Sequence, residues 1–539
     1  MFQLKEYQQR CLDELAGYFR RVIAFQAVTD KPEKMAFEEA DGRAPYRPVK
    51  ELPGLPYVCL RVPTGGGKTV MASHAVGVAC REYLQRERCL VFWLAPTTQI
   101  VSQTVKALQD KRHPYRQALD ATFGGRVSVM DLSAATTALK PADLSADTVI
   151  VVSTIQAPRV GDKEGRKVYT DDNGYLMDHF ENLRPGQLEM LDKTEAGKCA
   201  YSLANVFKLH RPVVIVDEAH NARTGLSFET LARFNPSCII EFTATPAADS
   251  NVLTSVSASE LKAEEMIKLP IRLHTRPQWK EAIQEALAMQ ARLEKQAEEE
   301  EKATGEYIRP IVLLQAQSKG DGNITFEMLK RSLLDDFDVP EAQIAVATGG
   351  VNDLDGLDVL ARDCDVRFII TVAKLREGWD CPFAYVLCSV SNLTSRTAVE
   401  QVMGRVLRMP HAHRKQNDDL NHAYAFVTSQ GFVEAANALT DALIDSGFDP
   451  YEARANIKPQ TDMPLLPDMP LWQPVVEVLP GKPTLAAIPE KLRQHVQTAP
   501  AKPAIDTGAA DVTATMVQYA GPAMSREDEK AWADAVASE

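Results

Sequence analysis

Residues 57–69 read Tyr-Val-Cys-Leu-Arg-Val-Pro-Thr-Gly-Gly-Gly-Lys-Thr, and this stretch decides the fold. Its first half, Tyr57 to Val62, is mostly apolar and predicts a buried strand. Three consecutive glycines follow, and Val70 to Leu84 carries a helical pattern. The stretch therefore predicts a strand, a glycine turn and a helix in direct succession.

The turn has the composition of a phosphate-binding loop. Glycine lets backbone N–H groups converge on a phosphate without a Cβ clash. Lys68 would bring positive charge to the β- and γ-phosphates of ATP, and the Thr69 hydroxyl is suited to ligate Mg²⁺. Val62 stands where the strict motif has Gly or Ala. The residues expected around the phosphates are Thr64, Gly65, Gly66, Gly67, Lys68 and Thr69.

A second element places two adjacent carboxylates at the end of another apolar run. Val213 to Val216 predicts a strand, and Asp217 and Glu218 follow it directly. In parallel sheets, ligands bind at the carboxyl ends of the strands. We expect Asp217 to hold Mg²⁺ through its water shell and Glu218 to polarise the attacking water.

Short apolar runs alternate with longer amphipathic stretches along the chain, which indicates parallel sheets with crossover helices. One series of predicted strands covers 57–62, 89–94, 148–152, 213–216 and 239–242. A second series covers 311–315, 344–347, 366–372, 385–389 and 422–427. Two series predict two sheets, and hence an α/β fold of two lobes.

The remaining segments suggest a domain plan of 1–270, 271–455 and 456–539. Residues 278–306 are rich in Ala, Glu, Lys, Gln and Arg, which predicts a long charged helix that leads the second lobe. Residues 159–200 are predicted to be a surface insertion in the first lobe. Prolines recur beyond residue 456, and we expect an extended, partly irregular extension there.

Composition points to an ordinary soluble, cytoplasmic protein. The chain has 539 residues, too many for one core, with 45% hydrophobic and 25% charged residues. No run of about 18 apolar residues appears, and the first residues lack the apolar core of a signal peptide. Nine cysteines occur without a CxxC pair, which favours reduced, buried thiols. We expect no association with a membrane.

The net charge of −13 argues against a polybasic nucleic-acid binder, because contact with phosphates requires Lys and Arg. It does not exclude a motor, which needs only a local track for one strand.

Asp217-Glu218-Ala219-His220 is a DEAH box, and the chain resembles superfamily 2 helicases. The resemblance covers about residues 2–430 and implies two RecA-like lobes with ATP and Mg²⁺ between them. It also implies roles for further residues of the first lobe. Gln8 would contact the edge of the adenine and Tyr7 would pack nearby, while His220, Thr243 and Thr245 would couple hydrolysis to movement of the lobes. The residues that would touch the nucleic-acid backbone here are Thr98, Gln99 and Thr154.

The resemblance continues in the second lobe. Thr371 would contact the strand backbone, and Gly378 and Asp380 would contact the nucleotide. Residues 401–408 match the pattern Q-x-x-G-R-x-x-R. Arg405 and Arg408 are three apart, so on a helix they would share one face and reach the γ-phosphate as arginine fingers. Gln401 precedes them by one turn and would position water.

A closer resemblance is to the helicase (Res) subunit of type III restriction enzymes, carried by residues 209–212, 260–270, 278–306 and 375–380. That family normally adds a nuclease with a PD…(D/E)xK core. Here Pro467-Asp468 is followed by Glu477, but Leu479 stands where lysine is required. We therefore predict no nuclease within this chain, so that a protein partner would supply nuclease or modification activity, or the chain is a truncated form.

The resemblance implies an ATP-dependent helicase or translocase, with DNA favoured over RNA, in restriction or defence. The alternative is a nucleic-acid-gated ATPase switch that recruits a partner without unwinding, because both would use the same lobes. A small-molecule kinase has no use for the second lobe's arginine pair.

Overall fold

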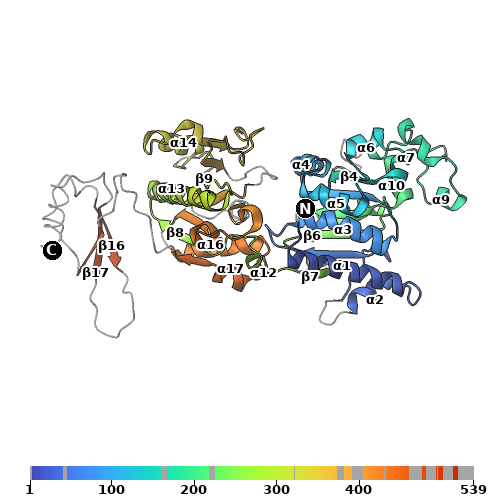
Figure 1. Ribbon diagram of the computed structural model, residues 1–539, viewed down its shortest axis with the longest axis horizontal. Coiled ribbons are helices and arrows are strands. Elements are labelled where there is room, and N and C mark those ends of the chain that lie inside the picture. Colours follow the sequence, from blue (N-terminus) through green and yellow to red (C-terminus); the bar gives the residue numbers. More distant parts are fainter. Residues whose placement is uncertain are drawn as a thin grey trace. The chain divides into compact units, whose positions relative to one another are not determined.

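The structure is a computed structural model that describes residues 3–39, 45–158, 167–217, 225–320, 322–372, 381–390, 405–429, 432–459, 476–480, 493, 496–501 and 514–519. The chain divides into two compact units, Met1–Pro464 and Leu465–Glu539 (Figure 1). The first unit contains two parallel sheets, and the second contains a small antiparallel one.

The first lobe is built on a seven-stranded sheet in the order β3-β4-β2-β5-β6-β1-β7, with every pair parallel. The central strands are apolar and buried along their length, as expected of a parallel sheet covered on both faces. The strands are β1 (Tyr57–Arg61), β2 (Leu90–Ala95), β3 (Val127–Asp131), β4 (Thr148–Thr154), β5 (Val213–Asp217), β6 (Cys238–Thr243) and β7 (Val252–Ser255).

Side chains alternate between the two faces of this sheet, and each face has its own hydrophobic cluster. Trp93 and Ile215 belong to the cluster that includes α1 (Glu6–Phe25), α3 (Lys68–Val78) and α5 (Pro114–Phe123). Phe92 and Val214, one residue away along the same strands, belong to the other cluster, with α6 (Leu132–Ala138), α10 (Leu203–His210) and α11 (Gly225–Ala232). Helices therefore cover both faces (Figure 1).

The other helical segments of the first lobe surround this framework. A π-helical turn, η1, continues α3, and η2 and α9 lie within the predicted insertion. These segments are α2 (Pro32–Glu38), η1 (Ala79–Tyr83), α4 (Thr98–Gln109), α7 (Pro141–Ala146), η2 (Gly174–Phe180) and α9 (Pro185–Glu189).

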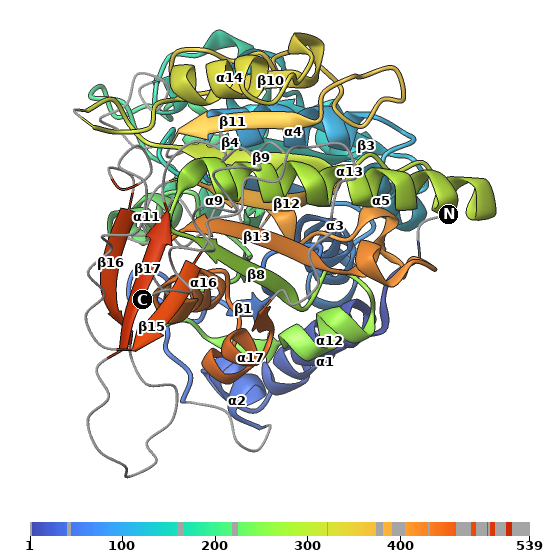
Figure 2. The same cartoon turned by 90° about the vertical axis from the view of Figure 1, so that its left-hand side faces the viewer.

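The second lobe repeats the plan with the strand order β10-β11-β9-β12-β13-β8-β14, again all parallel. Figure 2 shows most of this order, from β11 to β8. The strands are β8 (Ile271–Arg276), β9 (Ile311–Ala316), β10 (Ile344–Ala347), β11 (Phe368–Val372), β12 (Ala384–Ser389), β13 (Ala423–Thr428) and β14 (Ile457–Pro459).

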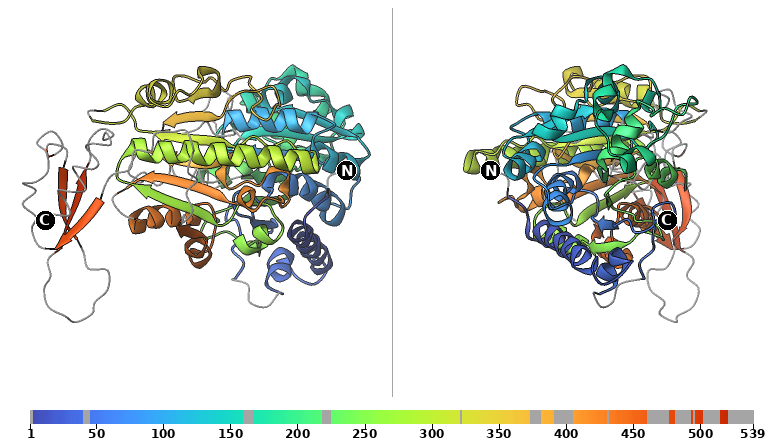
Figure 3. Two further views of the ribbon diagram at one scale, coloured as in Figure 1. Left: turned by 60° about the vertical axis from the view of Figure 1, so that its left-hand side comes forward. Right: turned by 90° about the vertical axis from the view of Figure 1, so that its right-hand side faces the viewer.

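The long helix α13 (Trp279–Thr304) lies across this second sheet (Figures 2 and 3). Its apolar side chains, such as Ile283 and Leu293, join the core, and Gly305 ends it in the left-handed conformation with a φ of 80°. The other helices are α12 (Ala258–Ala263), α14 (Phe326–Asp335), α16 (Phe432–Asp445) and α17 (Pro450–Ala455), with 3-10 turns η4 (Glu341–Gln343), η5 (Pro410–Ala412) and η6 (Asp418–Asn421).

The predicted fold class is confirmed: the chain has two RecA-like α/β lobes in tandem, and both predicted series of strands are present. The predicted charged helix corresponds to α13. Sequence reasoning did not find β3, β7, β8 and β14. Of these, β7 and β14 are short edge strands, and β3 is an edge strand with mostly half-buried side chains. Strand β14 lies past residue 455, the expected end of the second lobe.

The unit Leu465–Glu539 contains a small sheet within the extension that we expected to be extended and partly irregular. Its described strands pair antiparallel in the order β15-β17-β16. The two edge strands carry Pro480 and Pro500, whereas the central strand has no proline, because a central strand must donate hydrogen bonds on both sides. The bounds are β15 (Val476–Pro480), β16 (Val496–Ala501) and β17 (Ala514–Tyr519).

All nine cysteines are free thiols, and eight of them are buried. Within the described part of the chain, every helix is too short or too polar to cross a lipid bilayer.

Candidate nucleotide site between two lobes

The first lobe gathers the predicted site residues at one edge of its sheet. Strands β5, β6 and β1 are neighbours and run parallel, so their carboxyl ends meet. The glycine turn follows β1, Asp217 ends β5 and Thr243 ends β6. The carboxyl edge is where open parallel sheets bind ligands.

Thr69 and Asp217 come together at this edge although they lie far apart in the sequence. The Thr69 hydroxyl donates to Asp217 Oδ2 at 2.9 Å, and the Asp217 side chain is buried. Lys68 is also buried, with its Nζ 3.5 Å from the carbonyl oxygen of Val62. A hydroxyl and a carboxylate are oxygen ligands of the kind that Mg²⁺ prefers, so this pair fits a metal-nucleotide site.

The glycine turn has the geometry that such a loop needs. Gly65 and Gly67 have φ values of 89° and 74°, in the left-handed region that favours glycine. A Cβ on Gly66 would lie 2.5 Å from Val62 Cγ1, and one on Gly67 would lie 2.6 Å from Gln8 Nε2. Helix α3 begins at Lys68, so its free N–H groups and positive dipole end face the turn.

Side chains at the start of helix α1 form hydrogen bonds with the glycine turn. The Tyr7 hydroxyl donates to the carbonyl oxygen of Gly66 at 2.8 Å. The Gln8 amide donates to the same oxygen at 3.3 Å and to the Tyr7 hydroxyl at 3.2 Å, while its Oε1 accepts from the Lys5 backbone N–H. Burial raises the pKa of Tyr7 above its usual value, so the hydroxyl remains a donor. The contact of Gln8 with adenine stays a prediction.

We expect Tyr7→Phe to weaken ATP binding about fivefold, because it removes one hydrogen bond that fixes the turn. The measurement is the KM for ATP or the Kd of a nonhydrolysable analogue. Tyr18→Phe is the matched control. Tyr18 lies on the same helix as Tyr7, but its hydroxyl donates to the Glu33 carbonyl and not to the glycine turn. Equal ATP affinities for the two variants would contradict the role given to Tyr7.

The second lobe reaches the glycine turn through Arg408. A Cβ on Gly65 would lie 3.1 Å from Ile267 Cγ2 and 3.8 Å from Arg408 Cγ. Ile267 and Arg408 form an antiparallel bridge, flanked by hydrogen bonds from Met409 N to the Met266 carbonyl and from Lys268 N to the Leu407 carbonyl. The Arg408 side chain therefore lies beside the phosphate-binding turn.

The expected single helical face for Arg405 and Arg408 was wrong. Residues 405 and 406 are helical, but Arg408 lies past the helix end, in the bridge. Pro410 explains the change, because a residue before proline avoids the helical region, and Met409 is extended. Arg405 is buried and its carbonyl oxygen accepts from Arg408 N at 3.2 Å, so the two arginines remain close.

A second contact between the lobes was not anticipated from the sequence. The Thr64 N–H donates to the Ser446 carbonyl at 3.0 Å, and Arg61 Nη2 donates to the Gly447 carbonyl at 3.0 Å. Gly447 has a φ of 96°, and a Cβ there would lie 2.6 Å from the Ala244 carbonyl oxygen. Gly447 closely follows α16, and a glycine in that place usually marks a helix end.

We expect Gly447→Ala to lower ATP turnover at least tenfold, because the new Cβ would push Ala244 and the Thr64 contact apart. Gly356→Ala is the control: it has a φ of 78° and nothing within 4 Å of the added Cβ. Both variants carry the cost of a left-handed alanine, so a loss of ATPase activity in both would point to general destabilisation instead.

The other predicted site residues of the first lobe that are described lie at or next to the ends of its strands and helices. Thr243 is buried and its hydroxyl accepts from Thr245 N at 3.2 Å. Thr98, exposed, and Gln99, half-buried, open helix α4. Thr154 is buried, and its hydroxyl accepts from Ala157 N.

Thr371 is buried, and among the described residues its hydroxyl has no hydrogen-bond partner. The predicted site residues that lie outside the described part of the chain are Glu218, His220, Gly378, Asp380 and Gln401.

Residues 1–248 match a family model described as "Type III restriction enzyme, res subunit". No curated protein matches the chain.

Among solved structures, the chain is similar to the ATP-dependent Type ISP restriction-modification enzyme LlaBIII bound to DNA, with 14% identity and a TM-score of 0.43, over 83% of this chain and 30% of that one. It is also similar to the Mycobacterium smegmatis helicase Lhr bound to ssDNA and AMP-PNP, with 13% identity and a TM-score of 0.40, over 80% and 50%. A third is the DUF1998 helicase MrfA bound to DNA and AMPPNP, with 13% identity and a TM-score of 0.38, over 78% and 51%. The chain thus spans about half or less of the length of these proteins.

Proposed function

We propose that this chain, which carries a res-subunit domain of the type III restriction enzymes over residues 1–248, is a nucleic-acid-stimulated ATPase that acts as a helicase or translocase. The observation that carries the proposal is that the glycine turn of the first lobe lies against Arg408 and Ser446 of the second. Because hydrolysis would need residues of both lobes, it would be coupled to the movement of one lobe relative to the other.

In the proposed reaction, the first lobe holds the substrate and the second completes the site. Lys68 and the N–H groups of the glycine turn bind the β- and γ-phosphates of ATP. Thr69 and Asp217 would hold Mg²⁺, which neutralises phosphate charge when bound. Glu218, next to Asp217, takes the role of polarising the attacking water, and Gln401 that of positioning it.

Arg405 and Arg408 stabilise the charge that spreads over the transferred phosphoryl group. A guanidinium stays charged and bonds two phosphate oxygens at once, so it suits this role. Because Arg408 is paired with Ile267, which lies shortly before β8 of the second lobe, a change in its phosphate contact also acts on the connection between the lobes. We propose that Thr243 and Thr245, at the end of β6, with His220, transmit this change.

The protein would move along a nucleic-acid strand if the two lobes bind the strand alternately. Thr98, Gln99 and Thr154 are the proposed contacts of the first lobe, and Thr371 that of the second, with Gly378 and Asp380 serving the nucleotide. DNA is the favoured substrate over RNA. We further propose a cytoplasmic location and a protein partner with nuclease or modification activity.

Strand displacement and translocation assays test this function directly. The wild type should displace a labelled strand or a bound protein block from DNA in an ATP-dependent manner, and Lys68→Ala should not. ATP turnover that rises with nucleic acid, with neither displacement nor translocation on any DNA or RNA substrate, would reject the motor in favour of a nucleic-acid-gated switch.

A further inference from the structure

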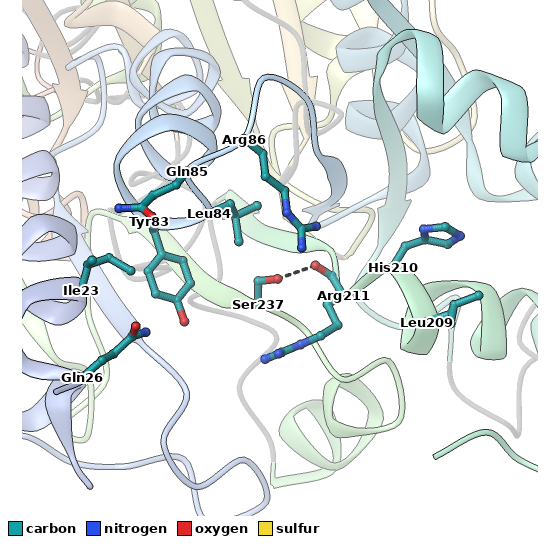
Figure 4. Close-up of a pocket in the computed structure, with 10 residues that line it drawn as sticks. All are labelled: Ile23, Gln26, Tyr83, Leu84, Gln85, Arg86, Leu209, His210, Arg211 and Ser237. Atoms are coloured by element: carbon teal, nitrogen blue, oxygen red, sulfur yellow. Dashed lines mark hydrogen bonds between the residues drawn. The ribbon is translucent and has the colours of Figure 1, made fainter. Parts of the chain in front are cut away.

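A cavity of about 360 Å³ opens in the first lobe at the edge of the sheet opposite the nucleotide site (Figure 4). Arg211 lies just before β5 and Ser237 just before β6, so both mark the amino ends of these strands. The volume of the cavity lies in the lower part of the range of small-molecule pockets. The lining residues are Ile23, Gln26, Tyr83, Leu84, Gln85, Arg86, Leu209, His210, Arg211 and Ser237.

The charged side chains that line this cavity are cationic. Two arginines line it and no carboxylate does, in a chain whose net charge is −13. Among the described residues, the guanidinium groups of Arg86 and Arg211 form no ion pair or hydrogen bond. Burial, beside His179 and Arg86, lowers the pKa of His210 to about 4, so His210 is neutral at pH 7 and the arginines supply the charge.

The backbone that carries both arginines is held in place. The Ser237 hydroxyl donates to the Arg211 carbonyl at 2.5 Å, as drawn in Figure 4. The Cys80 thiol donates to the Arg86 carbonyl at 3.2 Å. Gln85 and Arg211 both adopt positive φ, 53° and 49°, which non-glycine residues seldom do outside fixed turns. These contacts hold the backbone at Arg86 and Arg211, and their exposed side chains extend from it at the rim of the cavity.

The other wall of the cavity is apolar. Ile23 and Leu84 contribute aliphatic side chains, whereas the Leu209 side chain points away in Figure 4. The Tyr83 ring is stacked on Phe19, with centroids 5.1 Å apart, so its position is fixed. In Figure 4 the Arg86 side chain descends toward Ser237, and the Arg211 side chain runs toward Tyr83. The arginines suit an anionic group, and Ile23, Leu84 and the Tyr83 ring suit a flat or apolar one.

We propose that this cavity is a second ligand site, which binds a small organic phosphate of the nucleotide class. Arginine is the side chain best matched to phosphate oxygens, and the aliphatic wall suits a base or sugar. The site is distinct from the glycine turn, because its residues come from the opposite edge of the sheet.

The elements around the cavity also run to the nucleotide site. Helix α1 has Gln8 at its start and Ile23 near its end, and α3 with η1 runs from Lys68 to Tyr83. Strand β5 ends at Asp217, and β6 ends at Thr243. A ligand that stiffens these elements would alter ATP turnover; this consequence rests on the proposed function, whereas binding at the cavity does not.

The test is calorimetric titration of the full chain carrying Lys68→Ala, which weakens phosphate binding at the glycine turn, with AMP as the probe. AMP should bind, and Arg86→Gln and Arg211→Gln should each weaken it about tenfold. Arg112→Gln is the control, because Arg112 is 93% exposed and lies outside the cavity. Adenosine should not bind, and pyrophosphate should bind more weakly than AMP.

Gln85→Glu provides an independent variant, since Gln85 is exposed and the change adds a negative charge without changing size. This variant should also bind AMP more weakly than the Lys68→Ala chain does. The proposal is overturned if AMP does not saturate the chain at millimolar concentration, if adenosine or pyrophosphate equals AMP, or if the three cavity variants match Arg112→Gln. It is also overturned if only a single-stranded oligonucleotide shows the arginine dependence. None of these readouts uses ATP hydrolysis, so failure here is separable from failure of the proposed function.

Discussion

Lys68→Ala should reduce steady-state ATP hydrolysis by about a hundredfold or more. Removing one preorganised positive group from a phosphate-transfer site costs about this much. Lys68 is buried at the first position of α3, directly after the glycine turn. Helix α3 contains no other lysine that could replace it. The measurement is phosphate release at saturating ATP, with and without nucleic acid.

Lys34→Ala is the control, because Lys34 is an exposed lysine of α2 that forms a 4.0 Å ion pair with Glu38. Its ATPase rate should equal that of the wild type. A full hydrolysis rate in Lys68→Ala would reject the assignment of the glycine turn as the phosphate site.

Arg408→Gln should separate hydrolysis from binding. Removing an arginine finger lowers the catalytic rate by about a thousandfold or more in phosphoryl transfer. The nucleotide contacts of the first lobe remain, so the Kd of a nonhydrolysable ATP analogue should change little. Measuring kcat and this Kd on one preparation distinguishes a transition-state contact from a ground-state one.

Arg414→Gln is the matched control, since Arg414 lies in the loop that follows. Its side chain is 68% exposed, and its guanidinium forms an ion pair with Asp418 at 3.3 Å. It should keep both kcat and Kd. A normal kcat in Arg408→Gln would mean that the second lobe does not take part in hydrolysis through this residue.

Local sequence patterns predicted the first-lobe half of the site well. The glycine turn and the run before Asp217 are short segments whose conformation follows from their own residues. Parallel strands bring their carboxyl ends together, so the 2.9 Å contact of Thr69 with Asp217 follows once the sheet is recognised. The same reasoning gave the buried strands and the helix α13.

Contacts that depend on how distant segments pack were not predicted. The Ser446 and Gly447 carbonyls face Thr64 and Arg61 only because α16 ends beside the first lobe, and no local pattern encodes that. The placement of Arg408 in a bridge depends on pairing with Ile267, a partner far away in the sequence. The helix prediction ignored Pro410.

The cavity at the amino edge was likewise invisible to motif reading. Arg86 and Arg211 belong to separate loops. Arg86 lies in no recognisable pattern, and the stretch 209–212, which includes Arg211, supported the family resemblance without indicating a cavity. They face one cavity only after β2 and β5 pair in the sheet.

The central claim is that ATP hydrolysis uses residues of both lobes and is driven by nucleic acid. The most direct measurement is the ATPase rate of the wild-type chain without nucleic acid, and then with single-stranded DNA, duplex DNA and RNA. We predict a low basal rate that rises at least tenfold with a preferred nucleic acid, with DNA ahead of RNA. Nucleotide binding without hydrolysis under all four conditions would contradict the account.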